Sequence, residues 1–199
     1  SNGNTYPAVA RPWGMNAWTP QTGKMGSGWA YTYNARQING IKQTHQPSPW
    51  IGDYGQFALM AATGEKVFTI DDRKSWFSHK AELATPYYYR VYLADHDVTA
   101  EVTPTDRAAR LRFTYPESDS AHLIIDAFDR GSYIRVEPEK RRITGYTTRN
   151  SGGVPDNFKN WFVIECDQPF ESYDIWCYSL FRGAVGETTG NHKGAVLTF

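Results

Sequence analysis

The hydrophobic positions of this sequence recur mainly with a period of two residues. In the stretch YYYRVYL, Tyr87, Tyr89, Val91 and Leu93 fall on one face, and the residues between them fall on the other. The stretches DVTAEVT and ARLRFTY repeat this alternation, and the triplet DHD that precedes the second strand is typical of a turn. Alternation of this kind predicts β-strands with one buried face.

The second half of the chain continues the series with short apolar stretches divided by turn-rich pieces: AHLIIDAF, SYIRVEP, RITGYTT, NWFVIECD, YDIWCYSLF and GAVLTF. No apolar stripe at helical spacing persists for several turns, so helix is expected only in short turns. Many short strands between Gly, Pro, Asn and Asp predict an all-β fold, an antiparallel β-sandwich or barrel. No repeat, low-complexity segment or linker composition divides the chain, which predicts one domain over residues 1–199.

Charge and cysteine usage exclude several classes of protein. The 21 basic and 21 acidic residues balance, so the chain lacks the electrostatic footprint of a nucleic-acid-binding protein. No apolar run is long enough to span a membrane, and the first residues lack the features of a signal peptide. The two cysteines, Cys166 and Cys177, fit neither a disulfide framework nor a zinc site, and two free buried thiols are expected.

One loop, THQPSPWIGDYG at residues 44–55, has no helical or strand period. Pro47 and Pro49 restrict the backbone, so the loop is predicted to be stiff. It can present the aromatic face of Trp50 and the carboxylate of Asp53 to a ligand. The alternative is that Trp50 only fills the end of the core.

The sequence contains no catalytic motif with its own spacing, such as a nucleophile elbow, a phosphate-binding glycine loop or a calcium loop. Asp71-Asp72 and Asp95-His96-Asp97 are interpreted as solvated turns rather than metal ligands, and His45 and His79 as structural histidines. The compositional excess is aromatic, with 7 Trp, 13 Tyr and 10 Phe. Aromatic rings fill cores, and they also provide flat faces on which sugar rings stack.

Three blocks in consecutive order resemble a known family: GNTYPAVARPWGMNAWTPQTG, GWAYTYNARQINGIKQTHQPSPWIGDYGQFALMAATG and SWFSHKAELATPYYYRVYLADHDVTAEVTPTDRAARLRFTYP. They resemble the N-terminal domain of glycoside hydrolase family 92, the calcium-dependent exo-α-mannosidases, over about Gly3 to Pro116. The resemblance implies a β-sandwich that precedes a helical (α/α)-barrel catalytic domain, with the active site between the two and inversion at the anomeric carbon. On this reading the chain is the sandwich alone, a fragment truncated at both ends.

The resemblance also implies roles for particular residues. His45, Trp50 and Asp53 would help to form the substrate pocket at the domain junction. Asn4 would lie in a glycine-rich loop near that pocket, at a position where many relatives carry histidine. The catalytic acid and base and most Ca²⁺ contacts would come from the helical domain, so no catalytic or metal-binding residue is expected in residues 1–199.

The partners that the resemblance implies are α-mannoside glycans, as in N-glycan or mannan degradation, and the protein's own C-terminal catalytic domain. It also implies a periplasmic or secreted location. Two alternatives remain open at the level of the sequence: an independent carbohydrate-binding module, and a structural spacer domain without a ligand.

Overall fold

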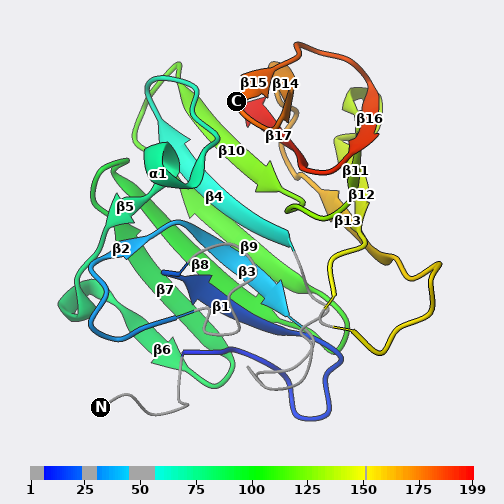
Figure 1. Cartoon of the computed structure of the whole chain (residues 1–199). Coiled ribbons are helices and arrows are strands. Elements are labelled where there is room, and N and C mark those ends of the chain that lie inside the picture. The colour runs from blue at the N-terminus through cyan, green and yellow to red at the C-terminus, as the bar shows by residue number, and fades with distance from the viewer. Residues whose placement is uncertain (1–6, 24–30, 45–56, 151) are drawn as a thin grey trace.

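The computed structural model of the chain describes residues 7–23, 31–44, 57–150 and 152–199. Strands dominate it, and the helices are single turns (Figure 1). The predicted all-β fold is therefore confirmed. The strands are β1 (Ala17–Gln21), β2 (Gln37–Ile38), β3 (Gly40–Thr44), β4 (Phe57–Thr63), β5 (Ser75–Trp76), β6 (Leu83–Thr85), β7 (Tyr88–Leu93), β8 (Val98–Pro104), β9 (Ala109–Thr114), β10 (Ala121–Asp126), β11 (Ser132–Glu137), β12 (Arg142–Thr147), β13 (Asn160–Glu165), β14 (Ser172–Cys177), β15 (Leu180–Phe181), β16 (Glu187–Gly190) and β17 (Lys193–Thr198). The helical turns are α1 (Ile70–Arg73), η1 (His79–Ala81) and η2 (Pro138–Lys140). None of the helices in the described ranges is long and apolar enough to cross a membrane.

Antiparallel pairing joins the strands into one large sheet and three smaller ones. The large sheet has the order β1-β3-β4-β10-β17-β14-β15. Two four-stranded sheets, β6-β7-β8-β9 and β13-β12-β11-β16, lie along different parts of it, and β2 pairs with β5 (Figure 1). The last described strand, β17, therefore lies between β10 and β14, inside the large sheet.

The core lies between the large sheet and the two four-stranded sheets. Buried side chains alternate along the strands, as the sequence predicts: Val98, Ala100 and Val102 of β8 are buried and the residues between them are less so. One continuous cluster joins them to apolar residues of β4, β10 and β17, and to β11, β12 and β13. Complete burial of an aliphatic side chain stabilises a fold by about 1.5–3 kcal/mol, so this cluster supplies the main driving force for the sandwich.

Two details differ from the simplest alternation. Tyr87, which shares a face with Tyr89 in the sequence pattern, lies in the turn before β7 and is 66% exposed. In β4 the first six residues are all buried, including successive positions that point to opposite faces. A strand covered on both faces has no polar face, so its sequence loses the period of two.

The register of the large sheet brings Trp176 of β14 directly over a glycine of β17. Gly194 pairs with Trp176 on one side and Asp126 on the other. A Cβ atom at residue 194 would lie 2.1 Å from the indole ring and 2.3 Å from the carbonyl oxygen of Ile125. The close approach of the indole therefore requires glycine at this position.

Both cysteines are free thiols, as the sequence predicts. Cys177 at the end of β14 is buried, and Cys166 just after β13 is half-buried.

Candidate functional site

Several connections meet at one end of the large sheet. β3 ends at Thr44, β4 begins at Phe57, β10 ends at Asp126 and β17 begins at Lys193. The registers pair Ala58 with Lys42 and with Asp126, so these ends lie in neighbouring rows of the sheet. The last residue of β3 and the first residue of β4 therefore lie at the end of the sheet where β10 ends.

The site residues predicted from the sequence fall outside the described residues. His45, Trp50 and Asp53 belong to segment 45–56, and Asn4 belongs to segment 1–6. Their roles remain predictions, and the candidate site consists of described residues at the end of the sheet where β3 ends and β4 begins.

The connection between β10 and β11, which we call the β10–β11 corner (residues 126–131), has an unusual backbone. Phe128 and Arg130 have φ angles of 62° and 70°, and Gly131 has a φ of 117°. Left-handed conformations of non-glycine residues cost free energy, so surrounding contacts must hold them, and such residues cluster at functional sites. Phe128 is completely buried, which restrains the backbone of the corner.

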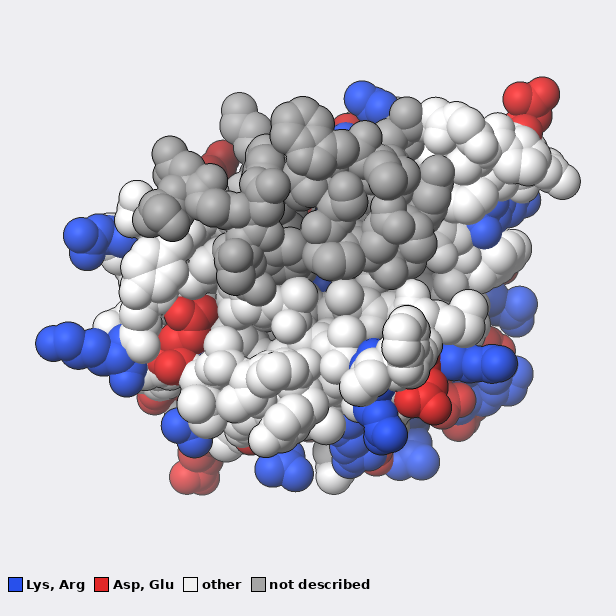
Figure 2. Space-filling model, turned by 90° about the horizontal axis from the view of Figure 1, so that it is seen from below, with Lys and Arg blue, Asp and Glu red and all other residues white. Residues whose placement is uncertain are grey.

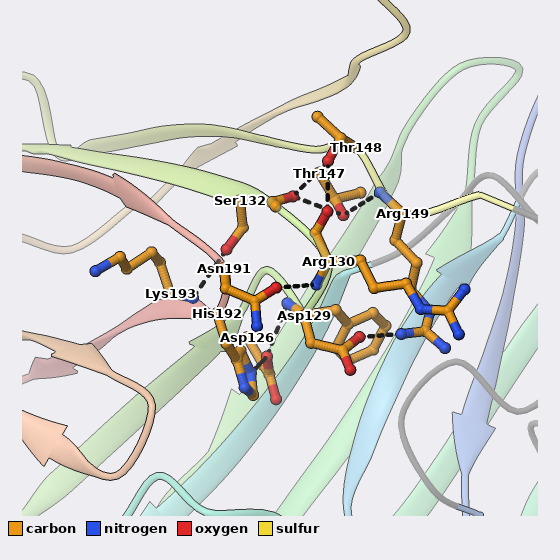
Figure 3. Close-up of polar contacts among 12 residues, drawn as sticks. Asp126, Asp129, Arg130, Ser132, Thr147, Thr148, Arg149, Asn191, His192 and Lys193 are labelled. Atoms are coloured by element: carbon orange, nitrogen blue, oxygen red, sulfur yellow. Dashed lines mark hydrogen bonds and ion pairs between the residues drawn. The ribbon is translucent and has the colours of Figure 1, made fainter. Parts of the chain in front are cut away.

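The carboxylate of Asp126 is the anchor of the corner (Figure 3). It forms an ion pair of 2.7 Å with Arg73 of α1, and its other oxygen accepts hydrogen bonds from His192 at 2.8 Å and from the backbone N–H of Phe128 at 2.9 Å. Arg73 also donates to the backbone oxygens of Asn39 and Phe68. The pair is buried, with side chains 1% and 2% exposed.

These contacts keep Asp126 charged. Burial alone raises the pKa of a carboxyl group, but the Arg73 guanidinium and the hydrogen bonds from His192 and Phe128 outweigh burial and lower the pKa of Asp126 below its ordinary value. A general acid needs a raised pKa instead. Asp126 is therefore suited to positioning the corner rather than to proton transfer.

A second set of contacts holds the exposed part of the corner (Figure 3). Asp129 forms an ion pair with Arg149, which follows β12. The backbone N–H of Arg130 donates to the side chain of Asn191 at 2.7 Å, and the hydroxyl of Thr148 donates to the carbonyl of Arg130 at 2.8 Å. Three connections, after β10, after β12 and before β17, are thereby joined into one polar surface.

This donor set does not fit a calcium ion. Calcium takes six to eight oxygen ligands, mostly from carboxylates and carbonyls, whereas Asp126 and Asp129 each pair with a guanidinium. Within the described ranges no group of three or more His, Cys, Asp or Glu side chains is placed to hold a metal ion. On the face shown in Figure 2, basic and acidic side chains are interspersed, in keeping with the balanced formal charge.

The other polar residues named from the sequence have structural contacts. The ring of His79 lies 2.6 Å from the carboxylate of Glu82 and 2.7 Å from the backbone oxygen of Tyr33. His96 is buried, and its ring lies 2.9 Å from the backbone oxygen of Arg73. Asp71 and Asp72 occupy the first turn of α1 rather than a loop. The structural interpretation of His79 and of the DHD turn agrees with these contacts.

Sequence reasoning missed the β10–β11 corner because it treated AHLIIDAF only as a strand. One local signal was available: a carboxylate, Asp126, closes an apolar strand and is followed three to five residues later by Asp129-Arg130-Gly131. The partners Arg73 and His192 are too distant in the sequence for spacing to indicate them.

The described strands place this protein in the class of antiparallel β-sandwiches. The β10–β11 corner and its contacts form a polar surface at one end of the sandwich. The chain matches the glycosyl hydrolase family 92 N-terminal domain over residues 1–199, and it belongs to this family. A comparison with curated protein sequences gives no match.

Solved structures of the family have the same fold. A family GH92 inverting mannosidase from Bacteroides thetaiotaomicron VPI-5482 is 44% identical over 99% of this chain, with a TM-score of 0.93. A family GH92 α-mannosidase from Bacteroides thetaiotaomicron is 29% identical over 100% of the chain, with a TM-score of 0.81, and its complex with mannoimidazole also matches, with 30% identity over 98% of the chain and a TM-score of 0.79. This chain spans only 27%, 29% and 28% of those chains.

Proposed function

We propose that this chain is the N-terminal β-sandwich of an α-mannosidase and shapes the substrate pocket of the full-length enzyme. The observation that carries the proposal is the position of the β10–β11 corner. This polar surface lies at the end of the sheet where the β3–β4 connection begins and finishes, and that connection contains His45, Trp50 and Asp53. Relatives that match nearly all of this chain are family GH92 mannosidases.

The proposed reaction is the hydrolysis of terminal α-mannosides with inversion. An inverting glycosidase uses a carboxylic acid to protonate the leaving oxygen and a carboxylate to activate water, with the two groups roughly 6.5–9.5 Å apart. Asp126 and Asp129 are both paired with arginines and do not provide such a couple. The family resemblance implies that the acid, the base and most calcium contacts belong to a C-terminal helical domain, and in this proposal the sandwich supplies walls of the pocket.

Each part of the sandwich has a defined task in this proposal. The buried Asp126–Arg73 pair fixes the backbone of the β10–β11 corner, and the corner supplies hydrogen-bonding groups beside the β3–β4 connection. Trp50 stacks on the sugar next to the scissile bond, while His45 and Asp53 bind hydroxyl groups. The proposed location of the full-length enzyme is the periplasm or the outside of the cell.

The direct test is a hydrolysis assay of the full-length protein on α-mannosides, followed by proton NMR. The first sugar released is expected to be β-mannose, because inversion converts the α linkage into a β product. Release of α-mannose, or no release of mannose from any α-mannoside, would contradict the proposal.

A second candidate function, direct carbohydrate binding, is favoured by an aromatic surface on the β13-β12-β11-β16 sheet. Tyr133 and Tyr146 stack with ring centroids 5.3 Å apart, and Trp161 packs edge-on against Tyr146 at 4.8 Å while remaining 60% exposed. Polar groups border the rings, including Arg135 and Thr189. An exposed ring beside hydrogen-bonding groups is the usual arrangement for binding a sugar.

Replacing Trp161 with alanine tests this second function. Electrophoresis of the full-length protein through a gel that contains soluble α-mannan should show retardation of the wild type and roughly tenfold weaker binding by the variant, because the stacking surface is lost. The matched control is Trp76→Ala, which removes a tryptophan of β5 that is 48% exposed. Equal retardation of all three proteins would show that the aromatic surface does not bind mannan.

A further inference from the structure

A buried lysine and a buried cysteine face each other on neighbouring strands at the same end of the large sheet. Lys193, the first residue of β17, pairs directly with Cys177, the last residue of β14. Each residue is 7% exposed. The amino group of Lys193 lies 2.7 Å from the sulfur of Cys177. The contact is short, because even N–H···O hydrogen bonds are about 2.7 Å or longer and sulfur is a larger acceptor atom than oxygen.

The lysine has no carboxylate partner within the described ranges, where its amino group forms a hydrogen bond only to the thiol. An amine nitrogen and a thiol sulfur are both nucleophiles, and the structure holds these two side by side in a buried position.

The surrounding backbone holds the two side chains in place. The N–H of Lys193 donates to the hydroxyl of Ser132 at 2.8 Å, and the N–H of Tyr178 donates to the carbonyl of His192 at 3.1 Å. The lysine side chain runs against Gly190, where a Cβ atom would lie 2.6 Å from Cε. The amine therefore has little freedom to leave the thiol, and such fixed proximity accelerates a reaction between two groups.

We propose that Cys177 and Lys193 form an oxidative modification site, in which a peroxide joins the two side chains covalently. In the first step the sulfur of Cys177 attacks one peroxide oxygen and the O–O bond breaks. Sulfur is oxidised to a sulfenic acid, and the departing hydroxide takes the thiol proton and leaves as water. In the second step the Lys193 amine attacks that sulfur. An S–N bond forms, the S–O bond breaks, and the sulfenic hydroxyl leaves as water with a proton from the amine.

Cys166 provides an internal control within the same chain. It is more exposed than Cys177, but burial and the nearby carboxylate of Asp167 raise the pKa of its thiol to about 11. Simple accessibility would make Cys166 the first cysteine to react. The proposal predicts the opposite order, with the buried cysteine modified first and linked to lysine.

The test is mass spectrometry of the full-length protein after treatment with dilute hydrogen peroxide and digestion with trypsin. The expected product is a cross-linked pair of peptides about 2 Da lighter than the sum of the reduced forms, with no cleavage after Lys193 and release of both peptides by dithiothreitol. A linked pair that retains the oxygen, about 14 Da heavier, would also support the site.

Two variants separate this linkage from ordinary oxidation. In Lys193→Met, which removes the amine and retains a long apolar side chain, Cys177 should go on to sulfinic and sulfonic acids without a cross-link. Cys166→Ser should form the cross-link as the wild type does. The proposal would be overturned if wild-type protein contained oxidised Cys177 beside an unmodified Lys193, or if Cys166 were oxidised while Cys177 stayed reduced.

Discussion

Asp126 shows how a single buried charge can organise a loop. Its carboxylate accepts hydrogen bonds from His192 and from the backbone of Phe128, and it neutralises Arg73. Each contact restrains a different segment of the chain. The strained backbone after Asp126 is stable only while these contacts are made, because its left-handed residues would otherwise relax.

Replacing Asp126 with asparagine should destabilise the protein strongly. The substitution leaves the Arg73 guanidinium buried without a counter-charge, and breaking a buried pair in this way costs about 3–5 kcal/mol. Chemical denaturation monitored by tryptophan fluorescence measures the loss. The matched control is Asp167→Asn, which breaks a pair with Arg110 in which both side chains are more than 60% exposed. The control should change the free energy of unfolding by less than about 1 kcal/mol, and equal losses in both variants would refute the role of burial.

The same pair predicts a pH dependence. The folded pKa of Asp126 lies below its ordinary value of 3.8, so the pair contributes stability above that value. The contribution is lost as the pH falls from 3.8 toward the lower folded pKa. Unfolding free energies measured between pH 6 and about pH 3 should therefore fall less steeply in Asp126→Asn than in the wild type.

Trp50 carries the prediction for substrate binding. If its ring stacks on the sugar next to the scissile bond, Trp50→Ala in the full-length enzyme should lower kcat/KM by about 5- to 150-fold, a loss on the order of 1–3 kcal/mol. A disaccharide should be affected more than 4-nitrophenyl mannoside, which offers little for the ring to contact. A variant with normal kcat/KM per folded molecule and a melting temperature well below that of the wild type would identify Trp50 as a core residue instead.

For single residues, the sequence predicts which side chains are buried better than it predicts which side chains are in contact. Val98, Ala100 and Val102 are buried as the alternation requires, whereas Tyr87 is not, because the strand begins one residue after it. The Arg73–Asp126–His192 network could not be derived, since its members come from three distant segments. Only the folded sheet brings them together.

Among the elements, β17 depends on the absence of a side chain at Gly194. Gly194→Ala should destabilise the protein by about 1–3 kcal/mol or more, because the methyl group would overlap the Trp176 ring and the Ile125 carbonyl. Gly186→Ala is the control, since a Cβ there meets no atom within 4 Å and its φ is not left-handed. Melting temperatures of the two variants separate overpacking from a general effect of losing glycine, and similar values would show that the indole moves aside easily.

Strands with one polar face were predictable from alternation, and strands buried on both faces were predictable only where they contain a continuous apolar run. The stretches that become β7, β8, β9, β11, β12 and β13 alternate clearly. β10 and β17 are buried throughout and were expected as strands from the apolar runs in AHLIIDAF and GAVLTF. β3 and β4 are buried almost throughout, including Lys42 at 1% exposure, so their sequences GIKQT and FALMAAT lack a period of two. Burial on both faces removes the period of two from a strand's sequence.

At the scale of the whole molecule, residues 1–199 alone should release no mannose from any α-mannoside, with or without calcium. Inverting hydrolysis needs a free acid and base pair at a suitable separation, and the carboxylates of the β10–β11 corner are neutralised by arginines. A discontinuous assay with 4-nitrophenyl α-mannoside checks this. Activity that co-purifies with the fragment through two different columns would show that it contains an active site.

The family and the sandwich class followed from the sequence, but the strand order did not. Period-two patterns identify strands without indicating which strands pair, and pairing in this fold joins segments far apart in the chain. β10 pairs with β4 and with β17, which begin more than 60 residues before and after it.

The position of β17 has a consequence for synthesis on the ribosome. Because β17 lies between β10 and β14, a nascent chain that ends before residue 193 holds two incomplete half-sheets with facing open edges. Open strand edges pair readily with other chains, and contacts between distant segments form slowly. The emerging domain must therefore keep β10 and β14 from pairing with other strands until β17 is translated. A chaperone that binds extended segments would have the longest time to bind these strands during that interval.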